Sequence, residues 1–148
     1  FNTATFISPS DLREFVFPWH RRIAEAAHSR GLPFLLHSCG NLKQVLPDLV
    51  SYVGINALHS LPPGIYDIAE LKAQYGDRIA LVGNVDVDLL ARGTPEQVRA
   101  WVRDLIRQVG PGGGLAVGSS NSITNYCQLE NYLAMLEEVR ASGSYPLR

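Results

Sequence analysis

The stretch GLPFLLHSCG, residues 31–40, carries the clearest signals of both fold and chemistry in this chain. Residues 33–37 form a short apolar run that follows a glycine, a pattern that predicts a buried β-strand. The strand ends in His37, and Cys39 comes two residues later. Imidazole and thiolate are ligands that zinc favours. The sequence therefore raises the question of a zinc site at the end of a buried strand.

A helix is predicted before this strand. Ser8 is suited to cap the free amide groups of a helix, and Pro9 suits the first helical position. An apolar stripe with spacings of three and four residues follows: Leu12, Phe15, Val16, Trp19 and Ile23. This spacing is typical of an amphipathic helix that packs against a core, and Gly31 ends the pattern.

The same alternation of strand and helix continues to the end of the chain. Further strands are expected at residues 55–59, 78–83 and 115–118, and further helices at residues 42–50, 65–75 and 129–139. Thr94-Pro95-Glu96-Gln97 is a capping box that opens another helix. Four apolar strands, each followed by a helix, predict an α/β fold with a parallel sheet covered by helices.

Spacing alone leaves two α/β architectures open, a small doubly wound sheet and part of a (β/α)8 barrel. A complete barrel needs ~250 residues, and this chain has 148. We treat residues 1–148 as one domain, and because the chain begins with Phe1 rather than Met we expect a piece of a longer protein. Half a barrel would leave two open strand edges and an uncovered inner face. We therefore expect self-association or pairing with an amino-terminal half of the barrel.

Composition narrows the classes of function. The chain is 46% hydrophobic with a net charge of -1, which gives no electrostatic reason to expect binding to nucleic acid or to an anionic membrane. The longest apolar runs are far shorter than the ~20 residues of a membrane span. Two cysteines are too few for a disulfide framework and are read as free thiols, metal ligands or catalytic groups. We expect a cytoplasmic protein whose function lies in a small-molecule site.

Polar residues follow every predicted strand. In parallel α/β folds the ligand lies beyond the carboxyl ends of the strands, so these residues are the candidates for function. We predict catalytic roles for His59, Asp86 and Asn121, and cofactor-binding roles for Asn84, Ser119 and Ser120. The glycine-rich stretch 110–114 precedes a strand instead, and we interpret it as a turn on the opposite side of the sheet.

The predicted metal ligands are His37, Cys39 and Cys127. Residues two apart on an extended strand point to the same face, so His37 and Cys39 can approach one ion. Cys127 is the only other cysteine and follows the fourth strand. Zinc at this position would hold a thiol as its reactive thiolate. The alternative is structural, with Cys39 as a small buried residue and His37 as a hydrogen-bonded strand-end histidine.

Several segments together resemble the carboxyl-terminal half of the uroporphyrinogen decarboxylase superfamily. They are ISP at 7–9, HSCGN at 37–41, LKAQYGDR at 71–78, GNVD at 83–86, GTPE at 93–96 and EN at 130–131. The resemblance spans nearly the whole chain and implies a (β/α)8 barrel. It also implies one of two activities: metal-free decarboxylation of the acetate side chains of uroporphyrinogen, or zinc-dependent methyl transfer from a methylated corrinoid to a thiol such as coenzyme M.

The resemblance also bears on the metal ligands. Within that superfamily His-x-Cys-Gly is the methyltransferase feature, and it carries zinc ligation over to His37 and Cys39. Aligned on Glu130-Asn131, Asn121 falls where the methyltransferases have a third zinc cysteine and the decarboxylases a histidine. Since an asparagine is a poor zinc ligand, Cys127, six residues later, becomes the candidate third ligand.

Our leading hypothesis is zinc-assisted methyl transfer to a thiol, with zinc and a corrinoid as cofactors and a corrinoid protein as partner. The second is metal-free decarboxylation of a tetrapyrrole, which needs basic groups at the barrel mouth. Arg92 is the nearest candidate for such a group. The third is that this chain by itself is a structural or binding fragment without turnover.

Overall fold

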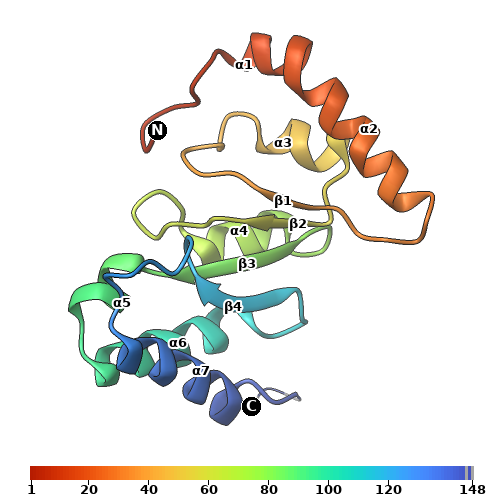
Figure 1. Cartoon of the computed structure of the whole chain (residues 1–148). Helices are drawn as coiled ribbons and strands as arrows, with labels where there is room; N and C mark the ends of the chain where they lie inside the picture. The colour runs from red at the N-terminus through yellow and green to blue at the C-terminus, as the bar shows by residue number, and fades with distance from the viewer. Residues whose placement is uncertain (146, 148) are drawn as a thin grey trace.

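The computed structural model describes residues 1–145 and 147. Its sheet contains four parallel strands in the order β1-β2-β3-β4: β1 (Leu35–His37), β2 (Ala57–His59), β3 (Ala80–Val85) and β4 (Leu115–Ser119). The predicted strands lie within two residues of these bounds, and the predicted α/β class is confirmed. Strand order follows chain order throughout (Figure 1). This is the arrangement of half of a (β/α)8 barrel, whereas a doubly wound sheet reverses its order.

Helical segments connect and flank the strands. They are α1 (Pro9–Asp11), the π-helical turn η1 (Leu12–Val16), α2 (Phe17–His28), α3 (Leu46–Asp48), the π-helical turn η2 (Leu49–Val53), α4 (Ile68–Tyr75), α5 (Val87–Arg92), α6 (Pro95–Val109) and α7 (Leu129–Ser142). The predicted caps are confirmed: the Ser8 hydroxyl accepts from the Asp11 amide, and Thr94 and Gln97 form both halves of the capping box. The α1 and α2 helices lie at the β1 end of the sheet, and α6 and α7 lie at the β4 end (Figure 1).

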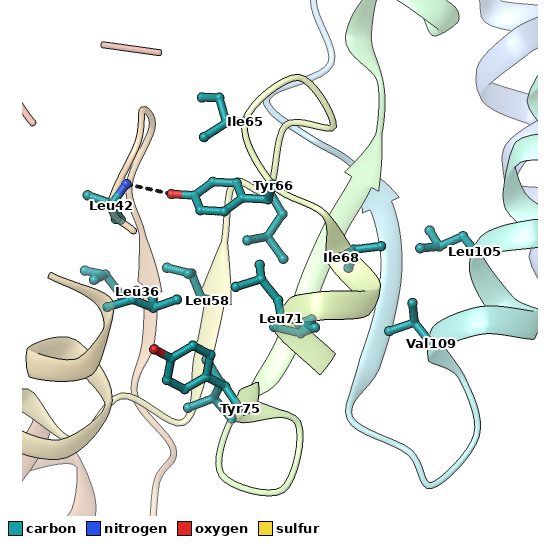
Figure 2. Packing of buried hydrophobic residues seen from close by; sticks show 14 of the residues in the cluster. Leu36, Leu42, Leu58, Ile65, Tyr66, Ile68, Leu71, Tyr75, Leu105 and Val109 are labelled. Carbon is teal, nitrogen blue, oxygen red and sulfur yellow. Dashed lines mark hydrogen bonds between the residues drawn. The ribbon is translucent and has the colours of Figure 1, made fainter. Parts of the chain in front are cut away.

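The core lies between the sheet and the helices that cover one of its faces. Leu36, Leu58 and Leu81 are register partners on neighbouring strands, and each is buried on this face. Figure 2 shows Leu36 and Leu58 beside Leu71 of α4. Apolar residues at every second strand position therefore build this half of the core, as expected for a helix-covered sheet.

The other face of the sheet is far less covered. Leu35 of β1 is 48% exposed although its neighbour Leu36 is buried. Along β1 and β2 the exposed and half-buried positions alternate with the buried ones. This exposure agrees with the open inner face of a half barrel.

The apolar stripe predicted for the first helix is only partly a core stripe. Leu12 and Val16 pack against the core, but Phe15, Trp19 and Ile23 are 60%, 59% and 55% exposed. The physical reason is the π-helical turn η1, which changes the residue spacing within the helix and so rotates the later positions away from the expected face. The inward-facing positions of α2 are instead Phe17 and Ala24.

Two further sequence interpretations can be compared with the structure. The glycine-rich stretch 110–114 forms the turn into β4 at its amino end, where the Lys72 ammonium donates to the Gly113 carbonyl, so its interpretation as a turn is confirmed. Among the described residues, none of the helices combines the length and apolar character that a bilayer crossing demands.

Candidate active site at the carboxyl ends of the strands

The loops after the strands bring His37, Cys39, His59, Ser119 and Asn121 into one cluster. His37 and His59 are register partners at the ends of β1 and β2. Their Nδ1 atoms lie 2.6 Å apart, and the two rings are tilted by 44° with centroids 4.7 Å apart. The two imidazoles therefore form a hydrogen-bonded pair on the open face of the sheet.

His59 reaches across the sheet to the far strand. Its Nε2 atom lies 3.1 Å from the main-chain oxygen of Ser119 on β4, although β3 lies between the two strands. Gly83 of β3 makes this reach possible. A Cβ atom at Gly83 would stand 2.9 Å from the Ser119 oxygen and 3.2 Å from the His59 ring, and the φ of +110° also favours glycine.

Cys39 lies beside the other end of the histidine pair. Its sulfur is 3.6 Å from His37 Nε2, and the side chain is exposed. The Asn121 amide nitrogen points at the same sulfur from 3.5 Å, while the Asn121 carbonyl oxygen accepts from the Ser122 amide at 2.8 Å. Asn121 thus faces Cys39 with its donor group.

The turn that carries Cys39 is fixed by its neighbours. Gly40 has a φ of +87°, and a Cβ atom there would stand 2.9 Å from main-chain atoms of Phe1. The buried Tyr66 hydroxyl donates to the Gly40 carbonyl at 2.9 Å and accepts from the Leu42 amide at 2.8 Å, the bond drawn in Figure 2. Burial raises the pKa of the Tyr66 phenol above its ordinary value. The tyrosine therefore ties the site to the core.

The other strand-end residues have structural bonds of their own. Asn84 is buried with a φ of +78°; its amide donates to the Leu61 carbonyl, and its main-chain oxygen accepts from the Trp101 indole. The Ser120 carbonyl accepts from the Ser60 hydroxyl at 2.7 Å. The binding roles predicted for Asn84, Ser119 and Ser120 stay predictions, but the Asn84 amide is already used within the fold.

Asp86 lies at the end of β3 and caps α5. Its carboxylate accepts from the Asp88 amide at 3.0 Å, so Asp86 is the capping residue of this short helix. Asp88 forms an ion pair with Arg92 in the last turn. The predicted catalytic role of Asp86 stays a prediction beside this structural one.

Cys127 is placed apart from the His37–Cys39 pair. Its sulfur lies 3.5 Å from the Thr124 hydroxyl, its amide donates to the Thr124 carbonyl, and its side chain packs against the core. Across residues 1–145 and 147 no three His, Cys, Asp or Glu side chains gather closely enough to hold one metal ion. The structure thus brings together two of the three predicted metal ligands.

Sequence reasoning missed two contributors to the site, the Ser119 main-chain oxygen and Gly83. A main-chain acceptor leaves no signature in the residue types. Gly83 does leave one, because a glycine inside a strand often marks a close approach of other atoms. What it could not show is that the approaching atoms are the ring of His59 and the carbonyl of Ser119.

Comparison with known proteins shows which family the chain belongs to. Residues 2–142 match the family model described as uroporphyrinogen decarboxylase (URO-D). A methylated-thiol–coenzyme M methyltransferase of Methanosarcina mazei is 31% identical over 146 residues, which are 98% of this chain and 36% of that protein. A uroporphyrinogen decarboxylase of Chlorobium limicola is 32% identical over 109 residues, 72% of this chain and 30% of that protein.

Solved structures give a matching result. A methyltransferase from Methanosarcina mazei superposes with a TM-score of 0.74 at 26% sequence identity, over 93% of this chain and 39% of that one. The chain thus spans between 30% and 39% of the length of these relatives. Because the family model covers nearly all of its residues, the chain belongs to the uroporphyrinogen decarboxylase family.

Proposed function

We propose that this chain contributes a zinc site to an enzyme that transfers a methyl group from a methylated corrinoid to a thiol. The observation that carries the proposal is the pair of donor atoms at the end of β1, His37 Nε2 and Cys39 Sγ, 3.6 Å apart on the open face of the sheet. A corrinoid protein is the partner that would deliver the methyl group.

The donor pair fits zinc in chemistry and in spacing. Zn–N bonds of ~2.0 Å and Zn–S bonds of ~2.3 Å at a tetrahedral angle put the two ligand atoms about 3.5 Å apart. The distance from His37 Nε2 to Cys39 Sγ, 3.6 Å, is close to this value. Both side chains are exposed, so an ion and a thiol can reach them.

The residues of the chain have separate tasks in this proposal. His37 and Cys39 hold the metal, and the Asn121 amide donates to the cysteine sulfur. Zinc bound there would supply an acidic centre that keeps the acceptor thiol deprotonated at neutral pH. A catalytic zinc usually has three protein ligands. We propose that the third comes from a re-routed loop carrying Cys127 or from chain beyond these residues.

The name of one relative supports the choice of methyl transfer. The Methanosarcina mazei protein is named for methyl transfer to coenzyme M and aligns over almost the entire chain. The assignment of a small-molecule thiol as acceptor follows from that likeness together with the His37–Cys39 pair.

The test is zinc binding by the purified chain and by two cysteine variants. We expect wild type to bind zinc and Cys39→Ser to weaken the affinity by at least about tenfold. Cys127→Ser should weaken it to a similar extent if Cys127 supplies the third ligand, and by less than about twofold if chain beyond these residues supplies it. Cys127→Ser removes the other free thiol and so distinguishes the two proposed sources of the third ligand. The proposal would be contradicted if wild type took up no zinc, or if Cys39→Ser bound zinc as tightly as wild type.

A second candidate is metal-free decarboxylation of uroporphyrinogen. It is favoured by the relatives that carry this name, including the Chlorobium limicola protein. A polyacidic tetrapyrrole needs cations at the barrel mouth, and Arg92 at the end of α5 already pairs with Asp88. Binding of a tetrapyrrole by the chain without zinc would support this candidate, and absence of any such binding would remove it.

A further inference from the structure

A line of polar contacts crosses the four strands on the open face of the sheet. It runs from Cys39 Sγ to His37 Nε2 at 3.6 Å, from His37 Nδ1 to His59 Nδ1 at 2.6 Å, and from His59 Nε2 to the Ser119 oxygen at 3.1 Å. Its far end is a main-chain carbonyl of β4, which belongs to the sheet itself. One end of the line is therefore fixed to the sheet, and the other end is the exposed thiol of Cys39.

The Ser119 carbonyl determines which ring nitrogens of His59 and His37 carry hydrogens. A carbonyl oxygen can only accept, so His59 Nε2 must carry a hydrogen. A neutral imidazole has one N–H, which makes His59 Nδ1 an acceptor. His37 Nδ1 must then donate across the 2.6 Å contact, and His37 Nε2 is left with its lone pair.

We propose that His59, anchored on the Ser119 carbonyl, is a positioning residue that holds His37 in the Nδ1–H tautomer and turns the lone pair of His37 Nε2 toward Cys39. This role differs from the catalytic role predicted for His59 from the sequence, because His59 acts through His37. The inference deepens the proposed function, since an unprotonated ring nitrogen is the form that can bind a metal.

Gly83 leaves the space through which His59 reaches the Ser119 carbonyl. The His59 ring passes over β3 at this residue, and the nearest ring atom would be 3.2 Å from a Cβ atom there. Any side chain at this position would also meet the Ser119 oxygen that anchors the line, at 2.9 Å. One glycine in β3 therefore lets a histidine of β2 bond to a carbonyl of β4.

The direct test is the tautomer of each ring in the whole chain, read from long-range ¹H–¹⁵N NMR spectra without metal and at a pH where the rings are neutral. We expect His37 to be protonated at Nδ1 and His59 at Nε2. In His59→Leu the acceptor is lost, and we expect the His37 hydrogen to move to Nε2 in most molecules. The matched control is His28→Leu, which removes a histidine bonded to Asn56 outside the cluster and should leave the His37 signals unchanged.

Zinc affinity gives a second readout. Loss of a partner that orients a metal-binding histidine typically costs 10- to 100-fold in affinity, and we expect this for His59→Leu. His59→Gln keeps an amide oxygen that can accept from His37 Nδ1–H, and we expect it to recover much of the loss.

The outcomes separate the two proposals. Protonation of His37 at Nε2 in wild type, or unchanged His37 signals in His59→Leu, would overturn the positioning role whether or not zinc binds. Absence of zinc binding alongside the expected NMR result would instead overturn the proposed zinc chemistry and leave the tautomer assignment standing. Because the wild-type spectrum decides the first point, the test does not depend on how well a variant folds.

Discussion

The two faces of the sheet are built from the same short strands and yet differ in almost every property. On the helix-covered face Leu36, Leu58 and Leu81 are buried against the core. On the open face the alternate positions of β1 and β2 are exposed or half-buried and end in His37 and His59. Neighbouring residues of one strand point to opposite faces, so one residue stabilises the core while the next belongs to the candidate site. The following changes would break or sharpen that separation.

The largest effect is expected on the covered face, for Leu58→Ala. Leu58 is 0% exposed and lies in the middle strand of a buried leucine row. Removing its side chain should lower the free energy of unfolding by about 2–5 kcal/mol through lost burial and a residual cavity. Urea unfolding followed by circular dichroism measures this. Leu35→Ala, the same change at a 48% exposed position of the open face, is the matched control and should cost less than about 1 kcal/mol.

The second-largest effect is expected for Gly83→Ala, which should change both the stability of the fold and the histidine cluster. The new methyl group would clash with the Ser119 oxygen at a φ of +110°, which should destabilise the fold by about 1–3 kcal/mol. It should also displace the His59 ring and shift the NMR signals of His37 toward those seen in the His59→Leu variant. Gly118→Ala is the control, because a Cβ atom there meets nothing within 4 Å. A folded Gly83→Ala protein with unchanged histidine signals would contradict the role given to this glycine.

The fold was far more predictable than the site, for a physical reason. Apolar runs of strand length and caps such as Ser8 and Thr94 act locally, so each could be read from its own segment of sequence. The parallel topology by itself predicts that His37, His59 and Asn121 lie together at the strand ends. Two features depended on contacts between distant segments, the anchoring of His59 on a β4 carbonyl and the separation of Cys127 from Cys39. Residue types do not report such contacts.

A third, intermediate effect is expected for Tyr66→Phe, because Tyr66 joins the covered face to the turn of Cys39. The change removes a donor to the Gly40 carbonyl and an acceptor of the Leu42 amide, and should cost about 1–2 kcal/mol of unfolding free energy. It should also loosen the turn and weaken zinc binding. Tyr52→Phe is the control, because Tyr52 is an exposed residue of η2 outside the cluster. Equal stability of Tyr66→Phe and wild type would show that the tyrosine does not hold the turn.

The same tyrosine predicts a pH dependence. Burial raises the pKa of Tyr66 in the folded protein above that of the unfolded chain, so the folded form binds the proton more tightly. The associated stability is complete below the unfolded pKa of about 10 and is lost as the pH rises toward the folded value. Wild type should therefore lose more unfolding free energy than Tyr66→Phe between neutral pH and pH values above about 10. Parallel pH profiles of the two proteins would refute this linkage.

The smallest effect on the fold itself is expected for Leu35→Asp, on the open face. Since Leu35 is half-exposed, the change should alter the stability of the separate chain by less than about 1 kcal/mol. It should nevertheless reduce self-association, because β1 is an edge strand and its inner-face residues are exposed. We expect wild type to sediment above its 16.3 kDa monomer mass at micromolar concentration and Leu35→Asp to shift toward monomer. The covered-face change Leu58→Ala would lower stability instead, so the two leucine variants separate folding from association. A wild-type chain that stays strictly monomeric in dilute sedimentation runs would show that the open face needs no partner of its own kind.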